Sequence, residues 1–325
     1  MVTAFAPATV SNVAVGFDIL GFPIEPQCEP LGDYVTIERD NTNLAICVQA
    51  IHGVVSDLPY GPLANTATVA LLKMQSELKL NFGMHVTIKK GIAKGSGLGG
   101  SAASAVAAVV AANHLLERPL PKEALLAFAL AGEVVASGTL HADNVGPSLL
   151  GGLQLIHSLE PIPKLITLPI PQGVKCVLVH PKLEVATKMA REVLAATVPL
   201  HTYVQQSALL ASFIAACYRS DFPLLKSSLQ DLIIAPQRAH LIPNFYAVQA
   251  KALEAGAMGC SISGAGPTIF SLVEDASGDG GDSGQAERVR LAMVEQFTMV
   301  GLATTSWIGE ISTEGARVVD GESKR

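Results

Sequence analysis

The chain has 325 residues, of which 49% are hydrophobic and 15% charged, so it has apolar side chains for a large buried core and enough length for two domains. Its net charge of −6 leaves no excess of positive charge for binding nucleic acid, and its five cysteines include no CxxC pair of the kind that holds zinc. These features indicate a reduced, globular protein for which nucleic acid is a poor partner.

The first half of the chain alternates short β-like runs with helical stretches, which predicts an α+β layer. We expect strands at 34–38, 45–49 and 84–90, and helices at 66–78, 101–116 and 122–135. Four prolines between residues 161 and 171 disfavour both a helix and a central strand. We therefore place a domain boundary there, which gives an N-terminal domain of residues 1–160 and a C-terminal domain of residues 161–325.

The second half begins with a predicted strand and ends with another. Strands are expected at 175–179, on both sides of the GAGP sequence and in TTSWIGEI, and helices at 184–195, 201–219, 221–229, 245–255 and 285–297. The order strand, helices, strand, strand, helix, strand is typical of a ferredoxin-like domain.

One uncharged stretch, Gly95 to Leu116, is long enough to raise the question of a membrane span. Its serines, Asn113 and His114 would need partners in lipid, and its alanines and glycines gain little from transfer, so we predict a buried helix and no membrane partner. The first residues lack a basic region followed by an apolar run, so we expect a cytoplasmic protein, or a plastid protein if the source is a plant and its transit peptide is missing.

The sequence GSGLGGSAAS at 95–104 predicts a phosphate-binding site. Glycines let a ligand approach backbone amides, and the helix that follows would direct its unpaired N–H groups to the same point. The spacing matches neither the Walker A motif nor the dinucleotide motif GxGxxG. A closely packed helix entry without a ligand is the alternative.

Two further islands of small residues, PATVSNVAVGFD at 7–18 and SISGAGPT at 261–268, accompany this stretch. The three together resemble the three motifs of the GHMP kinase superfamily. Within the superfamily the chain resembles homoserine kinases over nearly its whole length, through PATVSNVAVGFDILG, HADNVGPSLLGG at 141–152 and QRAHLIPNF at 237–245. Two positions depart from the family pattern: Ala93 stands in place of a proline, and Gly100 in place of the first of two serines.

The resemblance implies a two-domain GHMP kinase fold, with an N-terminal domain like domain 2 of ribosomal protein S5 and a ferredoxin-like C-terminal domain. It implies ATP-dependent phosphorylation of the L-homoserine hydroxyl to O-phosphohomoserine, with Mg²⁺, in threonine biosynthesis. Other GHMP kinases, of the mevalonate or diphosphocytidyl-methylerythritol type, and a non-catalytic ligand-binding member of the fold are the alternatives. A homodimer stays open.

The resemblance also assigns residues to the nucleotide. The phosphates would lie against Lys94, Gly95, Ser96, Gly97, Leu98, Gly99, Gly100, Ser101, Ala102 and Ser104. Asn65 matches a residue that contacts the base, although a helix N-cap explains it equally well. Ser101 and Glu133 would hold Mg²⁺, for which an exposed helix carboxylate is the alternative at Glu133.

The remaining assignments concern the reacting groups and the substrate. Asn144 is similar to an asparagine near the γ-phosphate, and with Ser101 and Glu133 it forms the predicted catalytic set. The predicted substrate-binding residues are Asn12, Asp18, His141, Asn144, Thr187, Arg191, Arg238 and Gly264. Arginines suit a carboxylate and an aspartate suits an ammonium group. Taken singly, each arginine could be a surface charge and His141 a structural residue.

Overall fold

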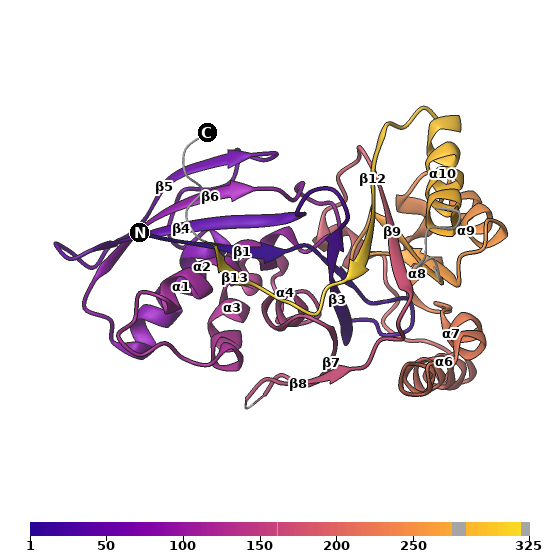
Figure 1. The fold of residues 1–325 in the computed structure, drawn as a ribbon, viewed down its shortest axis with the longest axis horizontal. Coiled ribbons are helices and arrows are strands. Elements are labelled where there is room, and N and C mark those ends of the chain that lie inside the picture. Colours follow the sequence, from indigo (N-terminus) through magenta and orange to yellow (C-terminus); the bar gives the residue numbers. More distant parts are fainter. Residues whose placement is uncertain (161, 275–283, 320–325) are drawn as a thin grey trace.

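The computed structural model describes residues 1–160, 162–274 and 284–319, and the strands in these ranges form two sheets (Figure 1). The first sheet has the order β13-β1-β4-β6-β5, and only its β5–β6 pair is parallel within the described residues. Its strands are β1 (Val2–Pro7), β4 (Gly32–Asp40), β5 (Ile46–Gly53), β6 (Gly83–Lys90) and β13 (Arg317–Val319). Helices α1 (Thr66–Leu78), α2 (Gly100–Asn113), α3 (Lys122–Ser137) and α4 (Val145–Leu150) lie on one side of it.

Helix α2 is the buried helix that the sequence predicts. Alanine and valine fill its length, and residues 102–112 are all buried between the sheet and helices α1 and α3. Small side chains allow this close approach of helix to sheet. None of the helices in the described ranges combines the length and the apolar character that a membrane span requires.

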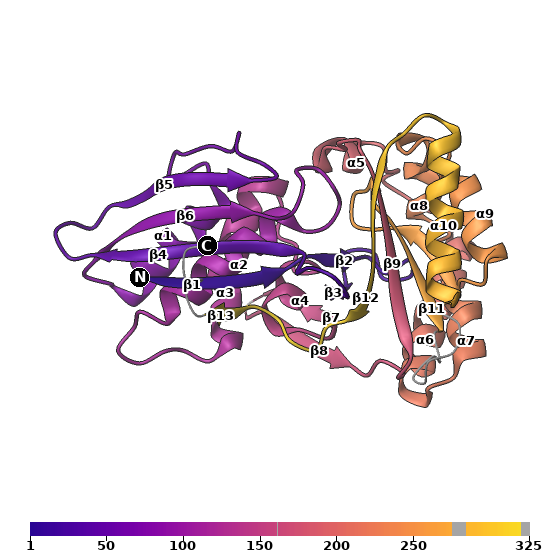
Figure 2. The ribbon, with the colours of Figure 1, turned by 45° about the horizontal axis from the view of Figure 1, so that its top comes forward.

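The larger sheet has the order β10-β11-β9-β12-β3-β7-β8, and β2 pairs with β3. Its strands are β2 (Thr9–Ser11), β3 (Leu20–Pro26), β7 (Leu153–Ser158), β8 (Lys164–Leu168), β9 (Val174–Pro181), β10 (Gly259–Ile262), β11 (Ile269–Glu274) and β12 (Thr304–Ile311). Strands β10-β11-β9-β12 are antiparallel neighbours, and α9 (Phe245–Glu254) and α10 (Gly284–Met299) cover them (Figure 2). This is the predicted ferredoxin-like arrangement, and the α+β class is confirmed.

The other helices lie between β9 and α9 in the chain. They are α5 (Thr187–Glu192), α6 (Leu200–Arg219), α7 (Phe222–Ser228) and α8 (Ile234–Arg238), followed by the 3₁₀ turn η1 (Ala239–Leu241). Helix α5 is shorter than the predicted 184–195, because residues 182–186 instead lead the chain past the glycine-rich segment, where Val185 N donates to Gly95 O at 3.1 Å. Helix α8 was not predicted.

The division into residues 1–160 and 161–325 stays a prediction, and strand pairing crosses it. Strands β3 and β7 belong to the larger sheet, and β13 returns from the far end of the chain to pair with β1 (Figure 1). The prolines at the expected boundary act as anticipated, since Pro163 and Pro169 enclose β8, which lies at the sheet edge. The two halves are therefore tied together by pairing, and the candidate site lies between them.

Candidate active site

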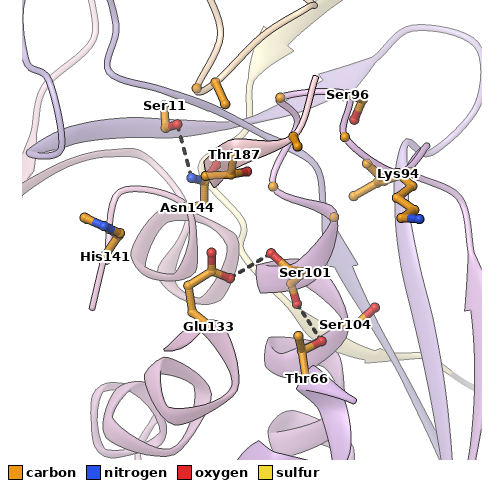
Figure 3. Close-up of a pocket in the computed structure, with 18 of the residues that line it drawn as sticks. Ser11, Thr66, Lys94, Ser96, Ser101, Ser104, Glu133, His141, Asn144 and Thr187 are labelled. Carbon is orange, nitrogen blue, oxygen red and sulfur yellow. Dashed lines mark hydrogen bonds between the residues drawn. The ribbon is translucent and has the colours of Figure 1, made fainter. Parts of the chain in front are cut away.

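A cavity of about 430 Å³ lies where the glycine-rich segment 95–104 meets the two islands of small residues at 7–18 and 261–268 (Figure 3). Backbone hydrogen bonds join them: Thr9 N donates to Leu98 O at 3.1 Å, Gly264 N to Ser11 O at 3.2 Å, and Thr268 N to Ser96 O at 3.2 Å. Segments that lie far apart in the sequence thus build one wall of the cavity.

Most of the predicted site residues line this cavity. The lining includes Asn12, Asp18, Asn65, Lys94, Gly95, Ser96, Gly97, Gly99, Gly100, Ser101, Ser104, Glu133, His141, Asn144, Thr187, Arg191, Arg238 and Gly264. The side chains of the other two, Leu98 and Ala102, instead pack into the hydrophobic core. Only their backbone groups can serve a ligand.

The glycines at 97 and 99 are required by packing between the islands as well as by access for a ligand. Gly97 has φ +78°, and a Cβ there would come within 2.9 Å of Gly266 backbone atoms. Gly99, with φ +69°, is the N-cap of α2, and its Cβ would lie 2.8 Å from Asn144 Oδ1. Close packing and an open helix N-terminus are therefore both present.

The side chain of Asn144 is held by two hydroxyl groups from β2. Its Oδ1 accepts a hydrogen bond from Thr9 Oγ1 at 2.7 Å. Its Nδ2 donates to Ser11 Oγ at 3.1 Å (Figure 3). These contacts fix the orientation of the amide, with Oδ1 toward Thr9 and Nδ2 toward Ser11. Sequence reasoning missed Thr9 and Ser11; the signal was two hydroxyl residues within the small-residue island that holds Asn12.

Ser101, at the start of α2, donates a hydrogen bond of 2.8 Å to Glu133 Oε2 on α3 (Figure 3). Glu133 is only 8% exposed, so the alternative of an exposed helix carboxylate is wrong. Burial, together with the charge of the neighbouring Asp143, raises the pKa of Glu133 to about 7. Burial likewise raises the pKa of Asp143 to about 7, with Asp18 adding to the effect.

This pair of oxygen ligands fits Mg²⁺. The described residues contain no group of three or more His, Cys, Asp and Glu side chains that could hold a metal. Magnesium in kinases is commonly bound by one or two protein oxygens together with the phosphates of the substrate. A buried carboxylate beside a hydroxyl at the start of α2 is a suitable protein contribution to such a site.

The opposite wall is cationic and surrounds Phe17. Arg191 forms two hydrogen bonds with Asp18, at 2.7 and 3.1 Å, and Arg238 donates to Ala190 O at 2.8 Å and Gly264 O at 2.9 Å. Both guanidinium groups lie over the Phe17 ring, at 5.5 and 5.2 Å from its centre. Arg238 is 2% exposed, so the surface-charge alternative is wrong for it. Burial lowers the pKa of Arg238 to about 10, which leaves it charged at neutral pH.

The remaining substrate-side residues hold this wall in shape. Asn12 donates from Nδ2 to Gly264 O at 2.9 Å and accepts from Asp18 N at 3.0 Å, with a left-handed φ of 69°. His141 Nδ1 lies 3.6 Å from Asp18 Oδ2, and burial lowers the pKa of His141. Thr187 lies one turn before Arg191 on α5, and both line the cavity.

The side chains of three further predicted nucleotide residues also make contacts within the protein. Asn65 is the N-cap of α1, where its Oδ1 accepts from Ala67 N at 3.0 Å, and its Nδ2 donates to Pro59 O at 2.9 Å. The N-cap interpretation is thus confirmed, and contact with the base stays a prediction. Lys94 lies 3.7 Å from Glu184, and Ser104 Oγ donates to Asp33 at 2.7 Å.

Comparison with known proteins agrees with this geometry. The family model for the GHMP kinase N-terminal domain matches residues 65–152, and the model for the GHMP kinase C-terminal domain matches residues 213–298. A homoserine kinase of Xylella fastidiosa is 45% identical over 316 residues, which is 97% of this chain and 93% of that protein. The chain belongs to the homoserine kinase family of GHMP kinases.

Other members of the homoserine kinase family are similar at comparable coverage. One from Chlorobium phaeobacteroides is 42% identical over 329 residues, covering 98% of this chain and 99% of its own length. The crystal structure of homoserine kinase from Cytophaga hutchinsonii has a TM-score of 0.91 at 36% identity and covers 98% of this chain and 97% of its own. Membership of this kinase family makes ATP the co-substrate and confirms the predicted fold and enzyme class.

Proposed function

We propose that this enzyme transfers the γ-phosphoryl group of ATP to the side-chain hydroxyl of L-homoserine. The observation that carries the proposal is one cavity that joins a helix N-terminus suited to phosphate with a wall suited to an amino acid. The relatives at 45% and 42% identity are homoserine kinases.

The phosphate side is built from backbone donors at the start of α2. Ser96 adds a hydroxyl that is buried and has no hydrogen-bond partner among the described residues, although it lines the cavity. A buried hydroxyl without a partner is costly, and a phosphate oxygen would satisfy it. We assign Ser96 Oγ to the nucleotide phosphates.

Ser101 and Glu133 would hold Mg²⁺, which neutralises phosphate charge when bound. Asn144, oriented by Thr9 and Ser11, would donate from its amide to the group in transfer. Phosphoryl transfer depends mainly on positioning and charge stabilisation, so these residues supply what the reaction needs from the protein.

The substrate wall offers opposite charges to the two ends of an amino acid. Arg191 and Arg238 would bind the α-carboxylate, and Asp18 would bind the α-ammonium group. Mevalonate has no ammonium group for Asp18, and diphosphocytidyl-methylerythritol has no carboxylate for the arginines, so both alternatives fit this wall less well. The presence of Ser101, Glu133 and Asn144 together disfavours a non-catalytic member.

We further propose a cytoplasmic location, or a plastid one for a plant source, with neither nucleic acid nor membrane as a partner. The five cysteines are free, as is typical of reducing compartments. A homodimer stays a proposal to be tested by light scattering.

The experiment is an ADP-release assay with purified enzyme, ATP and Mg²⁺, run with L-homoserine, L-serine, mevalonate and diphosphocytidyl-methylerythritol in turn. We expect ADP release that depends on homoserine and exceeds that with each other acceptor at least tenfold in kcat/KM. Equal or greater turnover with mevalonate or diphosphocytidyl-methylerythritol would overturn the assignment, and no acceptor-dependent turnover would favour the non-catalytic alternative.

A further inference from the structure

A buried polar cluster of Asp33, Lys90 and Ser104 lies beneath the phosphate-binding segment. Asp33 is 0% and Lys90 5% exposed, and their side chains form an ion pair. Lys90 Nζ also donates to Gly100 O at 2.7 Å and to Ser104 Oγ at 3.0 Å. Ser104 Oγ donates in turn to Asp33 Oδ2 at 2.7 Å, so every member of the cluster contacts the other two.

The Asp33 carboxylate accepts hydrogen bonds from residues that precede residues 95–101 and from a residue that follows them. Its Oδ1 accepts from Gly91 N at 3.0 Å and Ile92 N at 3.3 Å, where the chain leaves β6. Its Oδ2 accepts from Ser104, one turn below Ser101 on α2 (Figure 3). One side chain therefore closes the loop that carries Gly95 to Ser101.

Stability alone explains this cluster poorly. Buried ion pairs lose so much solvation that apolar residues of similar volume often give an equally stable protein. The three N–H groups of Lys90 have three protein acceptors, in Asp33, Gly100 and Ser104, although the residue lines the cavity. Lys90 therefore has no N–H group left for a phosphate, and the backbone amides of the glycine-rich segment are the donors that can bind phosphate.

We propose that Asp33 and Lys90 are positioning residues that hold the phosphate-binding segment in its binding conformation before the nucleotide arrives. A segment that is already ordered loses less conformational entropy when it binds, so affinity rises. This inference rests on the nucleotide site of the proposed function and adds two residues that contact no substrate.

The Asp33–Lys90 ion pair also has no net charge, so it does not repel phosphates bound above it. Without Lys90, the Asp33 carboxylate would be an unpaired negative charge near the N-terminus of α2, where it would repel phosphate. Replacing both residues removes that repulsion together with the contacts of Lys90 to Gly100 and Ser104, so only the effect of the weakened tether remains. The single and double variants therefore separate the two effects.

The test compares Asp33→Asn/Lys90→Met with the single variant Lys90→Met by calorimetric titration with ADP. We expect the dissociation constant for ADP to rise about tenfold in the folded double variant, equivalent to about 1.4 kcal/mol, and further in Lys90→Met. The homoserine KM should stay within twofold. If the cluster had only a structural role, its loss would change the ADP dissociation constant and the homoserine KM together.

Ser104→Ala provides a milder variant, with Ser228→Ala as its matched control. Ser228 is also a buried helix serine, with a hydrogen bond of 3.0 Å to Leu225 O on α7, outside the residues that line the cavity. We expect Ser104→Ala to raise the ADP dissociation constant at least threefold and Ser228→Ala to leave it unchanged.

A folded double variant that binds ADP within twofold of the wild type would overturn the proposal. If the double variant does not fold, an ADP affinity of Ser104→Ala equal to that of Ser228→Ala would overturn it instead. Nucleotide binding needs no acceptor, so a wild-type enzyme that binds ADP but does not phosphorylate homoserine contradicts the proposed function without deciding this test.

Discussion

Replacing Glu133 by glutamine should make the protein more stable above pH 7 and remove most of its Mg²⁺-dependent activity. The substitution keeps the shape of the side chain and an oxygen that can accept the hydrogen bond from Ser101, which measures 2.8 Å in the wild type. It removes only the buried negative charge. Stability and activity should therefore change in opposite directions.

The magnitude follows from the pKa of Glu133, which burial raises from 4.5 to about 7. Because the folded state holds the proton more tightly than the unfolded state, wild-type stability falls as the pH rises from 4.5 to 7. The full penalty, about 3 kcal/mol, is present above pH 7. Glutamine carries no such penalty, so the variant should exceed the wild type by up to about 3 kcal/mol at pH 8 and by much less at pH 5. Asp143 titrates in the same range, so the observed midpoint belongs to the pair.

Urea denaturation at pH 5 and pH 8 measures the stabilities, and ADP release at saturating Mg²⁺ measures the activity, which should fall about 100-fold or more. Glu123→Gln is the control, because Glu123 is an exposed carboxylate in the first turn of the same helix. Its effect should be within about 1 kcal/mol at both pH values. A Glu133→Gln protein that is less stable than the wild type at pH 8, or one that keeps wild-type turnover, would refute this reasoning.

Three further changes test other parts of the site. Arg191→Leu should raise the homoserine KM roughly ten- to a hundredfold with little change in the ATP KM, and equal effects on both would assign Arg191 a structural role. Asn144→Ala should lower kcat about 100-fold in steady-state assays with both KM values nearly unchanged, whereas an effect confined to KM would contradict a role in transfer. Gly97→Ala should lower the free energy of unfolding by about 1–3 kcal/mol in urea, because φ is +78° and its Cβ would meet Gly266; an unchanged value would show that the segment relaxes freely.

Local sequence signals located the helices well where the chain itself marks their ends. Helix α1 occupies the predicted 66–78, because Asn65 caps its first turn and the apolar period continues through it. Strands β2 and β3 were not predicted, because β2 has only three residues within an island of small residues and β3 contains two prolines, which disfavour a strand. Their pairing with each other and with β7 and β12 is a long-range contact that no local pattern reports.

The candidate site was predictable as far as its residues belong to recognisable motifs. The resemblance assigned Glu133, Arg191 and Arg238 to one site, and in the structure all three line the same cavity. Asp33 and Lys90 were missed, because LGDYV and IKKG read as ordinary strand ends with exposed charges. Only the contact of β4 and β6 with α2 buries these two side chains beneath the glycine-rich segment.

The most direct test of the central claim is a phosphorus NMR spectrum of the product formed from ATP, Mg²⁺ and L-homoserine. The account predicts one new phosphomonoester signal, coupled to the two protons on the side-chain carbon that bears the oxygen, in amounts equal to the ADP released. Free phosphate alone, or a signal from phosphate on the carboxylate or amine of homoserine, would contradict it.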